Sequence, residues 1–250
     1  SRHVRHAAPL SDAAPGVFAN YSIAARASGD HQGLSLGHEL RTAGRWGLLS
    51  SSAQLNVDSE KGGEYRRGVT RWQRDDLERQ LTLQAGDVFA TTRTGAVNLG
   101  GVRIAKDPGA LDPLTPTYPV PFLGGIALDP STVEVLSNQA RVLNADVERG
   151  QFRVEGSVLS PGANQTQVVV RDRFGRSSVL SDTRVYVSPA LLRPKLTTWD
   201  VALGQVRQDE NTYGTTVGSA NFATGVSDRW TLRGSTQADE DGRANLTLEI

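Results

Sequence analysis

The fold of this chain follows from the stretch Leu77-Glu78-Arg79-Gln80-Leu81-Thr82-Leu83-Gln84-Ala85-Gly86-Asp87. Side chains alternate between the two faces of a β-strand, so its apolar and polar residues fall on opposite faces. The apolar set is Leu77, Leu81, Leu83 and Ala85, and the polar set is Glu78, Gln80, Thr82 and Gln84. The same period of two returns at Trp230–Ser235 and Ala244–Ile250. The pattern predicts an all-β protein built from strands with two different faces.

Turns divide the alternating sequence into ten spans of strand length. Six precede residue 111, at about 17–27, 31–41, 45–57, 64–74, 77–87 and 97–106. Four follow residue 194, at about 197–207, 212–223, 228–238 and 243–250. Each span approaches the roughly 9–11 residues that a tilted strand needs to cross a bilayer. The lengths indicate part of a transmembrane antiparallel β-barrel, whose polar face supplies lumen-facing residues such as Glu78, Gln80, Arg229 and Arg233.

Between Leu111 and Pro194 the sequence changes character. Short Val-rich segments at 132–136, 140–143, 151–154, 165–170 and 183–187 alternate with turns rich in Gly, Asn and Pro. Strands at this spacing predict an inserted β-sandwich of roughly 80 residues. Its expected core is Val133, Val135, Val142, Phe152, Val154, Val168 and Val170.

Proline-rich segments lie on both sides of the inserted sandwich. Because proline fixes φ and lacks the N–H that a sheet requires, these segments are expected to stay out of the sheet and to act as hinges. The hinge candidates are Pro113, Pro116, Pro119, Pro121, Pro189 and Pro194.

The expected division of the chain has four parts. Residues 1–15 form a linker, 16–109 hold strands one to six, 110–192 form the sandwich, and 193–250 hold strands seven to ten. Ten strands cannot close a wide barrel, so we expect an incomplete wall. The chain starts with Ser1 and contains no Met, which suggests a piece of a longer or processed protein.

Composition and motifs argue against several classes of function. Lys+Arg and Asp+Glu both number 27, so charge does not favour a nucleic-acid partner. With no Cys, the chain has no disulfide and no thiolate metal site. Its 4 His residues show no metal-ligand spacing, and no nucleophile, phosphate-binding or dinucleotide motif is present. We therefore expect no catalytic residues, no metal or other cofactor and no small-molecule substrate.

One charged cluster in the inserted segment allows two interpretations. It consists of Arg171, Asp172, Arg173 and Arg176 around a turn. A solvated turn accounts for these residues, since Asp and Gly are common in turns. Alternatively, the cluster is a docking surface for the barrel or for a periplasmic partner.

An ordered set of motifs resembles the outer-membrane fimbrial usher family of the chaperone/usher pathway. Pro15–Tyr21 resembles its linker into the first barrel strand, and Gly44–Ser52 resembles its third strand. Thr70–Asp76 with Leu81–Asp87 looks like the family's "W-x-x-D-D…GD" hairpin, and Asn98–Ala105 resembles its "GG" strand. Val168–Arg176 resembles a hairpin of the family's plug domain, and Tyr186–Pro194 resembles the exit from that domain. At Lys195 the family pattern has Gly, so a different local turn is expected there.

The resemblance covers about residues 15–223 and carries functional expectations. It implies a pore in the bacterial outer membrane that assembles and secretes fimbrial subunits, with the inserted domain as the plug that gates the channel. The implied partners are periplasmic chaperone–subunit complexes and the outer-membrane lipid bilayer. A full usher has, in addition, an N-terminal docking domain, the remainder of a barrel of about 24 strands and two C-terminal domains, and these additional parts are not recognisable in this sequence.

Two other functions remain compatible with the strand pattern. One is an outer-membrane porin or receptor whose inserted domain binds a ligand. The other is a secreted all-β protein that binds carbohydrate or acts as an adhesin.

Overall fold

The computed structural model describes residues 15–28, 31–60, 62–92, 95–112, 116–120, 123–154 and 159–250. Within these ranges the regular structure is almost entirely β, and a single short helix, α1 (Pro108–Leu111), is present. No helix in the described residues is long and apolar enough to cross a membrane. Two of the expected hinges, Pro113 and Pro121, lie outside the described residues.

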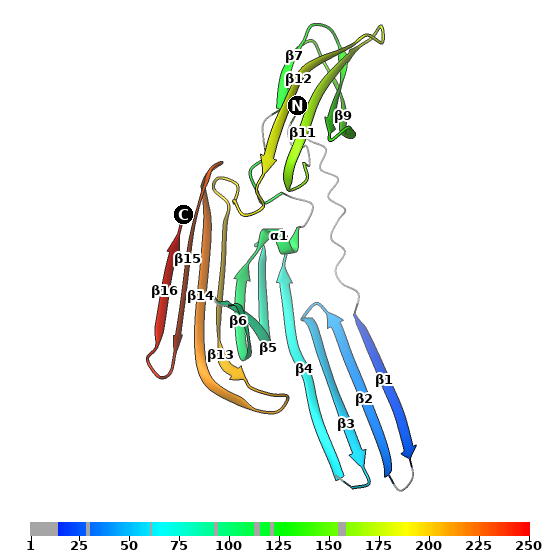
Figure 1. Cartoon of the computed structure of the whole chain (residues 1–250), viewed down its shortest axis with the longest axis vertical. Helices are drawn as coiled ribbons and strands as arrows, with labels where there is room; N and C mark the ends of the chain where they lie inside the picture. Colours follow the sequence, from blue (N-terminus) through cyan, green and yellow to red (C-terminus); the bar gives the residue numbers. More distant parts are fainter. Residues whose placement is uncertain are drawn as a thin grey trace. The chain divides into compact units, whose positions relative to one another are not determined.

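Most of the strands form one ten-stranded sheet of hairpins. Its order is β1-β2-β3-β4-β5-β6-β13-β14-β15-β16, so the inserted segment falls between β6 and β13 (Figure 1). The strands before it are β1 (Gly16–Ser28), β2 (His31–Gly44), β3 (Gly47–Asp58), β4 (Gly62–Asp76), β5 (Leu81–Thr92) and β6 (Gly95–Lys106). Those after it are β13 (Thr197–Arg207), β14 (Tyr213–Ser227), β15 (Trp230–Asp239) and β16 (Ala244–Glu249). As described, the sheet stays open, with β1 and β16 as its outer strands.

The sheet has the two faces that the alternation predicts. On one face, Leu34 pairs with Val57 and Leu36 pairs with Leu55. On the other face, the Ser35 hydroxyl donates to Asn56 Oδ1 at 2.8 Å, the Gln84 amide donates to Gln73 Oε1 at 2.9 Å, and Arg103 forms an ion pair with Asp200. Such a sheet suits a wall with hydrocarbon on one side and water on the other.

The alternation places the start of one strand too early. Leu77–Gln80 form the turn between β4 and β5, so the strand begins at Leu81 rather than at Leu77. Gln80 has φ of 57°, a left-handed conformation that a strand does not use. Leu77 continues the apolar period by chance, and sequence alternation alone does not distinguish it from a strand residue.

The β5–β6 hairpin leaves the path of its neighbour β4. Pairing between β4 and β5 stops at Arg71 and Gly86, whereas β5 and β6 stay paired to Thr92 and Gly95. Gly86 has φ of 101°, and a Cβ on it would collide with the Thr70 carbonyl oxygen, so the departure requires glycine. Beyond it, the hairpin packs on Ala202 of β13 and Val217 of β14 through its own buried residues, which are Val88, Ala90 and Leu99.

Ala202 identifies the face that the hairpin covers. It pairs with Arg103, whose side chain lies on the polar face of the sheet, and it is flanked along β13 by Val201 and Leu203 of the apolar face. The part of the β5–β6 hairpin beyond Gly86 therefore folds over the polar face of β13 and β14.

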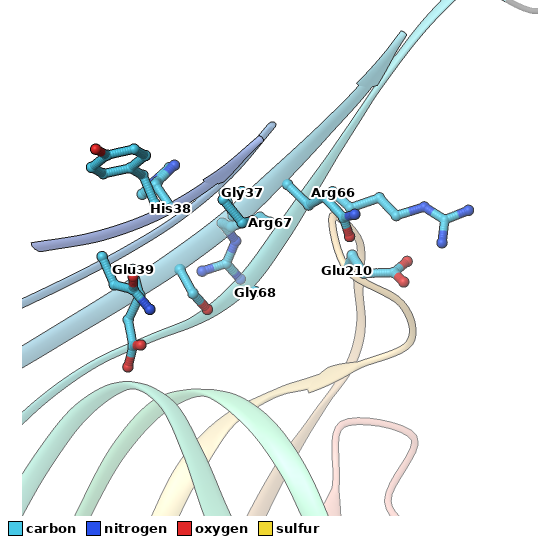
Figure 2. Close-up of a pocket in the computed structure, with 13 residues that line it drawn as sticks. Gly37, His38, Glu39, Arg66, Arg67, Gly68 and Glu210 are labelled. Carbon is cyan, nitrogen blue, oxygen red and sulfur yellow. The ribbon is translucent and has the colours of Figure 1, made fainter. Parts of the chain in front are cut away.

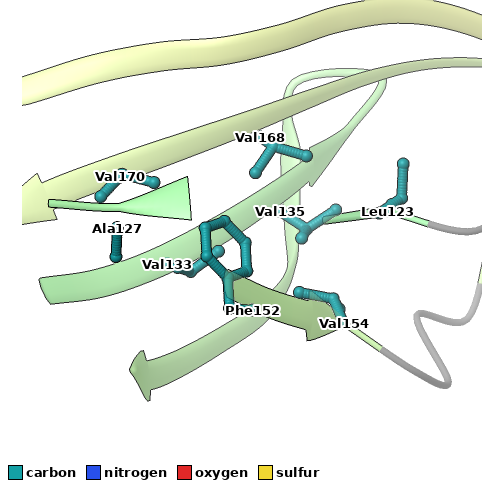
Figure 3. Packing of buried hydrophobic residues seen from close by; sticks show 8 residues of the cluster. All are labelled: Leu123, Ala127, Val133, Val135, Phe152, Val154, Val168 and Val170. Atoms are coloured by element: carbon teal, nitrogen blue, oxygen red, sulfur yellow. The ribbon is translucent and has the colours of Figure 1, made fainter. Parts of the chain in front are cut away.

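The inserted segment forms a β-sandwich of its own, as predicted. One sheet pairs β7 (Leu123–Ala127) with β10 (Gly150–Val154). The other has the order β12-β11-β8-β9 and consists of β8 (Ser131–Ser137), β9 (Ala140–Val147), β11 (Gly162–Asp172) and β12 (Ser177–Val187). Both sheets contribute to one core, which is formed by Leu123, Ala127, Val133, Val135, Phe152, Val154, Val168 and Val170 (Figure 3).

The prediction is wrong for one residue of the expected core. Val142 is 37% exposed, whereas its neighbour Leu143 packs against the core. The register between β8 and β9 shifts at this point, because Val135 pairs with Leu143 and Leu136 pairs with Arg141. Val142 is the extra residue of this irregularity, which turns its side chain out of the sandwich.

By compactness the chain divides into two units. The first contains β1–β6 with Trp199–Phe222 and Gly234–Leu248. The second contains Pro108–Thr198 with Ala223–Arg233 and the last two residues. The second unit therefore joins the inserted sandwich, its linkers and short parts of β14 and β15.

Candidate functional site

The place where the sandwich enters the sheet is the first candidate site. Trp199–Val206 of β13 pair directly with Leu99–Lys106 of β6, although the whole sandwich lies between them in sequence. A domain with its own core is therefore inserted between two hydrogen-bonded neighbours of a wall. Removing or moving such a domain leaves the ladder between β6 and β13 available to hold the wall together.

The linker that leaves the sandwich is attached to the sheet. Lys195 N donates to Gly225 O at 2.9 Å, and Gly225 N donates to Leu196 O at 2.9 Å. Leu192 N donates to the Thr231 hydroxyl at 2.8 Å. Gly225 allows this approach because a Cβ there would collide with the carbonyl oxygens of Leu192 and Arg193. Residues 192–196 are thus fixed to β14 and β15.

The expectation that Pro194 keeps its linker out of the sheet is wrong. Pro194 forms an isolated parallel bridge with Gly225. The missing proline N–H is no obstacle here, because the hydrogen bonds use the N–H of Lys195 and the carbonyl of Leu196. Lys195, at the position where the family pattern has glycine, adopts φ of 68°, a left-handed conformation that glycine adopts more readily.

The other described hinge candidates lie close in sequence to residues 192–196 or in the linker before the sandwich. Pro189 is in the turn that follows β12, and Pro116 and Pro119 are in the linker before β7. The two linkers meet where Arg193 N donates to Thr117 O at 2.7 Å. Whether these prolines act as hinges stays a prediction.

The charged cluster of the sandwich is brought together at the tip of the β11–β12 hairpin. Arg176 Nε lies 2.7 Å from Asp172 Oδ2, and Asp172 Oδ1 also accepts the backbone N–H groups of Phe174 and Arg176. The guanidinium carbons of Arg173 and Arg176 lie 5.0 and 5.4 Å from the centre of the Phe174 ring. Phe174, which is not among the predicted docking residues, is 68% exposed.

The Asp172 carboxylate is stabilised in its charged form. Desolvation acts to raise its pKa, but hydrogen bonds from the Arg176 side chain and from the backbone N–H groups of Arg176 and Phe174 outweigh it. The pKa of Asp172 therefore lies below its usual range. The tip is a hydrogen-bonded turn that carries an exposed aromatic ring next to two cations, a combination able to contact an acidic or apolar surface.

The expected lumen-facing residues lie in three different settings. Glu78 and Gln80 belong to the turn between β4 and β5, and Arg229 belongs to the turn between β14 and β15. Arg233 is in β15 and half-buried. Only Arg233 of these four is a strand residue, and the facing of the four toward a lumen stays a prediction.

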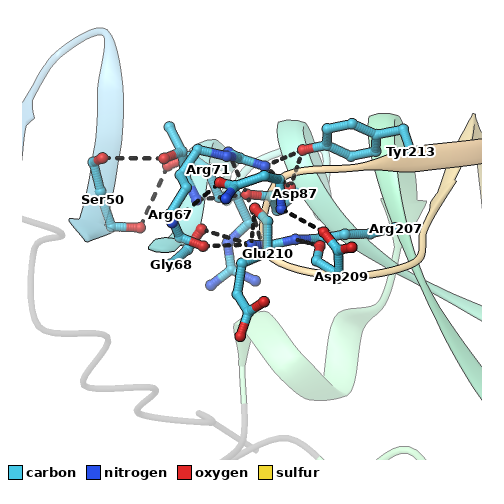
Figure 4. Close-up of polar contacts among 12 residues, drawn as sticks. Ser50, Arg67, Gly68, Arg71, Asp87, Arg207, Asp209, Glu210 and Tyr213 are labelled. Carbon is cyan, nitrogen blue, oxygen red and sulfur yellow. Dashed lines mark hydrogen bonds and ion pairs between the residues drawn. The ribbon is translucent and has the colours of Figure 1, made fainter. Parts of the chain in front are cut away.

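A polar cluster that was not predicted from the sequence is centred on Asp87, a residue only 5% exposed (Figure 4). Its carboxylate accepts two hydrogen bonds from Arg67, at 2.9 and 3.0 Å, and one from the Tyr213 hydroxyl at 2.7 Å. Arg207 lies 3.5 Å away. The signal was present in the alternation, since Asp87 follows Leu81, Leu83 and Ala85 on the apolar period. An acid at an apolar position indicates a buried partner.

A polar hollow lies beside this cluster (Figure 2). It has a volume of about 510 Å³ and is lined by β1–β4 together with Glu210. Its charged lining residues include Glu39, Arg66 and Arg67. Within the described residues no group of three or more His, Cys, Asp or Glu side chains could hold a metal ion.

Comparison with known proteins gives matches to one family of proteins. Residues 38–247 match the family model described as "Usher: Outer membrane usher protein". The chain is 25% identical over 169 residues to the outer membrane usher protein HtrE of Escherichia coli K12, covering 67% of this chain and 19% of HtrE.

Among solved structures, the chain is similar to the E. coli P pilus tip assembly intermediate PapC-PapD-PapK-PapG. The TM-score is 0.55 at 17% identity, with 96% of this chain and 35% of that chain covered. The P pilus usher PapC translocation pore gives a TM-score of 0.43 at 17% identity, with 94% and 50% covered. The chain thus spans half or less of these relatives. The family match extends over most of its residues, and the chain belongs to the outer membrane usher proteins.

Proposed function

We propose that this chain is the part of an outer-membrane usher pore that contains the gate. The parent pore assembles and secretes fimbrial subunits delivered by a periplasmic chaperone. The inserted sandwich is its plug. The family assignment makes the receptor and adhesin interpretations unnecessary, and no catalytic role is proposed.

One observation carries the proposal. A sandwich with a closed core of its own is inserted between β6 and β13, which stay hydrogen-bonded to each other. A domain in that position can change place as a rigid body while the wall remains intact. A wide pore for folded subunits needs such a movable block, because it otherwise leaks ions and metabolites.

The linkers indicate where the movement occurs. Residues 192–196 are fixed to β14 and β15, and Arg193 holds Thr117 of the other linker. The pivots then lie on the sandwich side of this bond, near Pro119 and Pro189. Polar residues such as Glu78, Gln80, Arg229 and Arg233 supply reversible contacts at the wall, each worth about 0–1 kcal/mol in water. The tip at Arg171–Arg176 is the proposed docking surface of the plug.

The test is conductance of the full-length parent protein in a planar bilayer. Residues 120–188 are deleted and replaced by a short Gly/Ser linker, which keeps Thr117 and Arg193 in the chain. The expected result is a change from a mostly closed protein to one with large, steady conductance, since the block is lost and the β6–β13 ladder remains.

A matched control inserts the same Gly/Ser linker after Pro119 without deleting the sandwich. It should assemble and stay mostly closed. A deletion protein that resists SDS until it is boiled, yet conducts no more than this control, would contradict the gate and favour a receptor with an inserted ligand-binding domain. Secretion of fimbrial subunits by the same variants tests the assembly role separately.

A further inference from the structure

The edge of β4 loses its strand partner where the β5–β6 hairpin turns away. β5 pairs with β4 only over Leu81–Gly86, opposite Arg71–Asp76. Within the described residues, the part of β4 before Arg71 has no neighbouring strand on the side that faces β5. Its backbone N–H and C=O groups on that side therefore have no strand to pair with. An open strand edge is not tolerated in a bilayer, because each unpaired group there costs several kcal/mol.

Side chains take the place of the missing strand. The Asn211 amide accepts from Arg67 N at 3.3 Å and donates to Tyr65 O at 2.9 Å, as a strand residue would do with its backbone. Arg207 Nη2 donates to Arg67 O at 2.7 Å and to Gly68 O at 3.1 Å.

Asp87 makes the next contact along the edge of β4, toward the β5–β6 hairpin. Its carboxylate accepts the Thr70 N–H at 2.7 Å, and the two guanidinium groups of Arg67 and Arg207 lie against it. The Tyr213 hydroxyl donates to the same carboxylate. Tyr213 itself lies against Gly100 of β6, where any Cβ would collide with its ring. The Asp87 carboxylate of β5 therefore links β4 to the end of β13 and the start of β14.

We propose that Arg207, Asn211 and Asp87 form a side-chain seam that closes the wall along β4 and holds the β5–β6 hairpin over the polar face. These three are positioning residues, since they act by placing backbone rather than by binding a substrate. The contacts of the seam lie among β4, β5, β6, the end of β13, the start of β14 and the loop between them, and none of those cited involves a residue of the sandwich. The side chains that cover this edge of β4 come from the same chain, from the end of β13 and the loop after it, which lie several strands away in the sheet.

The first test measures hydrogen exchange in the full-length parent protein, in detergent, on a peptide covering about residues 62–71. Asn211→Ala removes both contacts with β4, and Asn211 is exposed, so no cavity forms. Exchange in this peptide should become about fivefold to thirtyfold faster, as expected for the loss of one or both hydrogen bonds, each worth about 1 kcal/mol. Asn211→Asp keeps the acceptor for Arg67 N and should retain part of the protection.

The matched control is Asn56→Ala. The Asn56 side chain hydrogen-bonds Ser35, and Asn56 lies opposite Glu64 on the side of β4 that pairs with β3, away from the edge in question, so exchange at 62–71 should change much less. Unchanged exchange in Asn211→Ala would overturn the seam. An increase spread evenly over all strands would also overturn it, since that result means general destabilisation.

The second test follows the hairpin. The chain has no Cys, so Val88→Cys introduces a unique thiol into this part of the protein at a position 1% exposed. Its labelling by a water-soluble maleimide should be slow, and addition of Asp87→Asn should raise the rate at least tenfold if the carboxylate holds the hairpin. Equal labelling rates in the two proteins would overturn that part of the proposal. If Asp87→Asn fails to reach the membrane, Arg207→Gln serves as the second variant.

Discussion

At the scale of single residues, Lys195 occupies a position that suits glycine. Its φ of 68° lies in the left-handed region, which costs an L-residue roughly 1–2 kcal/mol. The conformation persists because Lys195 N and Leu196 O both pair with Gly225. The hydrogen bonds of the linker thus determine the backbone conformation at Lys195, despite the steric cost of a Cβ in this conformation.

Lys195→Gly should therefore stabilise the folded protein. The expected gain is about 0.5–1 kcal/mol, because glycine removes the strain but adds entropy to the unfolded chain. The measurement is urea unfolding of the full-length parent in detergent. Lys195→Ala is the control, since it removes the charge but keeps the Cβ. An equal gain in Lys195→Ala would mean that the charge, and not the backbone, causes the effect.

At the scale of elements, alternation located most strands but not their irregularities. The spacing of Leu81, Leu83 and Ala85 located β5, but Leu77 extended the same period into a turn, and the strand continues to Thr92, beyond the predicted end at residue 87. β7 was not predicted because Gly124 and Gly125 interrupt its apolar pattern. The displacement of Val142 was not foreseen because it depends on the register between β8 and β9.

The polar contacts were the least predictable part of the candidate sites. The Arg171–Arg176 cluster is local in sequence, so its residues could be grouped in advance. The Asp87 cluster joins Arg67 to Tyr213 and Arg207, which come from the other side of the inserted domain. Only the departure of β5 at Gly86 and the path of the β13–β14 loop bring these residues together.

The two faces of β16 should tolerate charge differently. Leu248 is 71% exposed on the apolar face, and Thr247 is its neighbour on the opposite face. Leu248→Arg should impair assembly of the full-length parent, since Arg on the lipid face costs about 2–4 kcal/mol at the bilayer midplane. Thr247→Arg should have a much smaller effect. The fraction of heat-modifiable protein in outer membranes measures both, and equal tolerance would contradict the assignment of the faces.

At the scale of the whole molecule, the inserted sandwich should fold without the wall. Residues 110–192 expressed alone are expected to give a soluble monomer with cooperative unfolding, because both sheets bury one shared core. Val133 is fully buried, so Val133→Ala should lower the free energy of unfolding by about 2 kcal/mol. Val142→Ala, on the exposed position, should change it by less than about 0.5 kcal/mol. A disordered circular-dichroism spectrum for the parent segment would contradict the domain assignment.

The bond between Arg193 and Thr117 has a consequence for the order of folding. β6 and β13 are far apart in sequence, and pairing them directly requires closure of a long loop. If the sandwich folds first, its joined linkers bring the ends of these strands together, and the remaining closure involves only the short stretches between each strand and this bond. The inserted domain would then act as an internal template for barrel assembly, before any channel exists for it to obstruct.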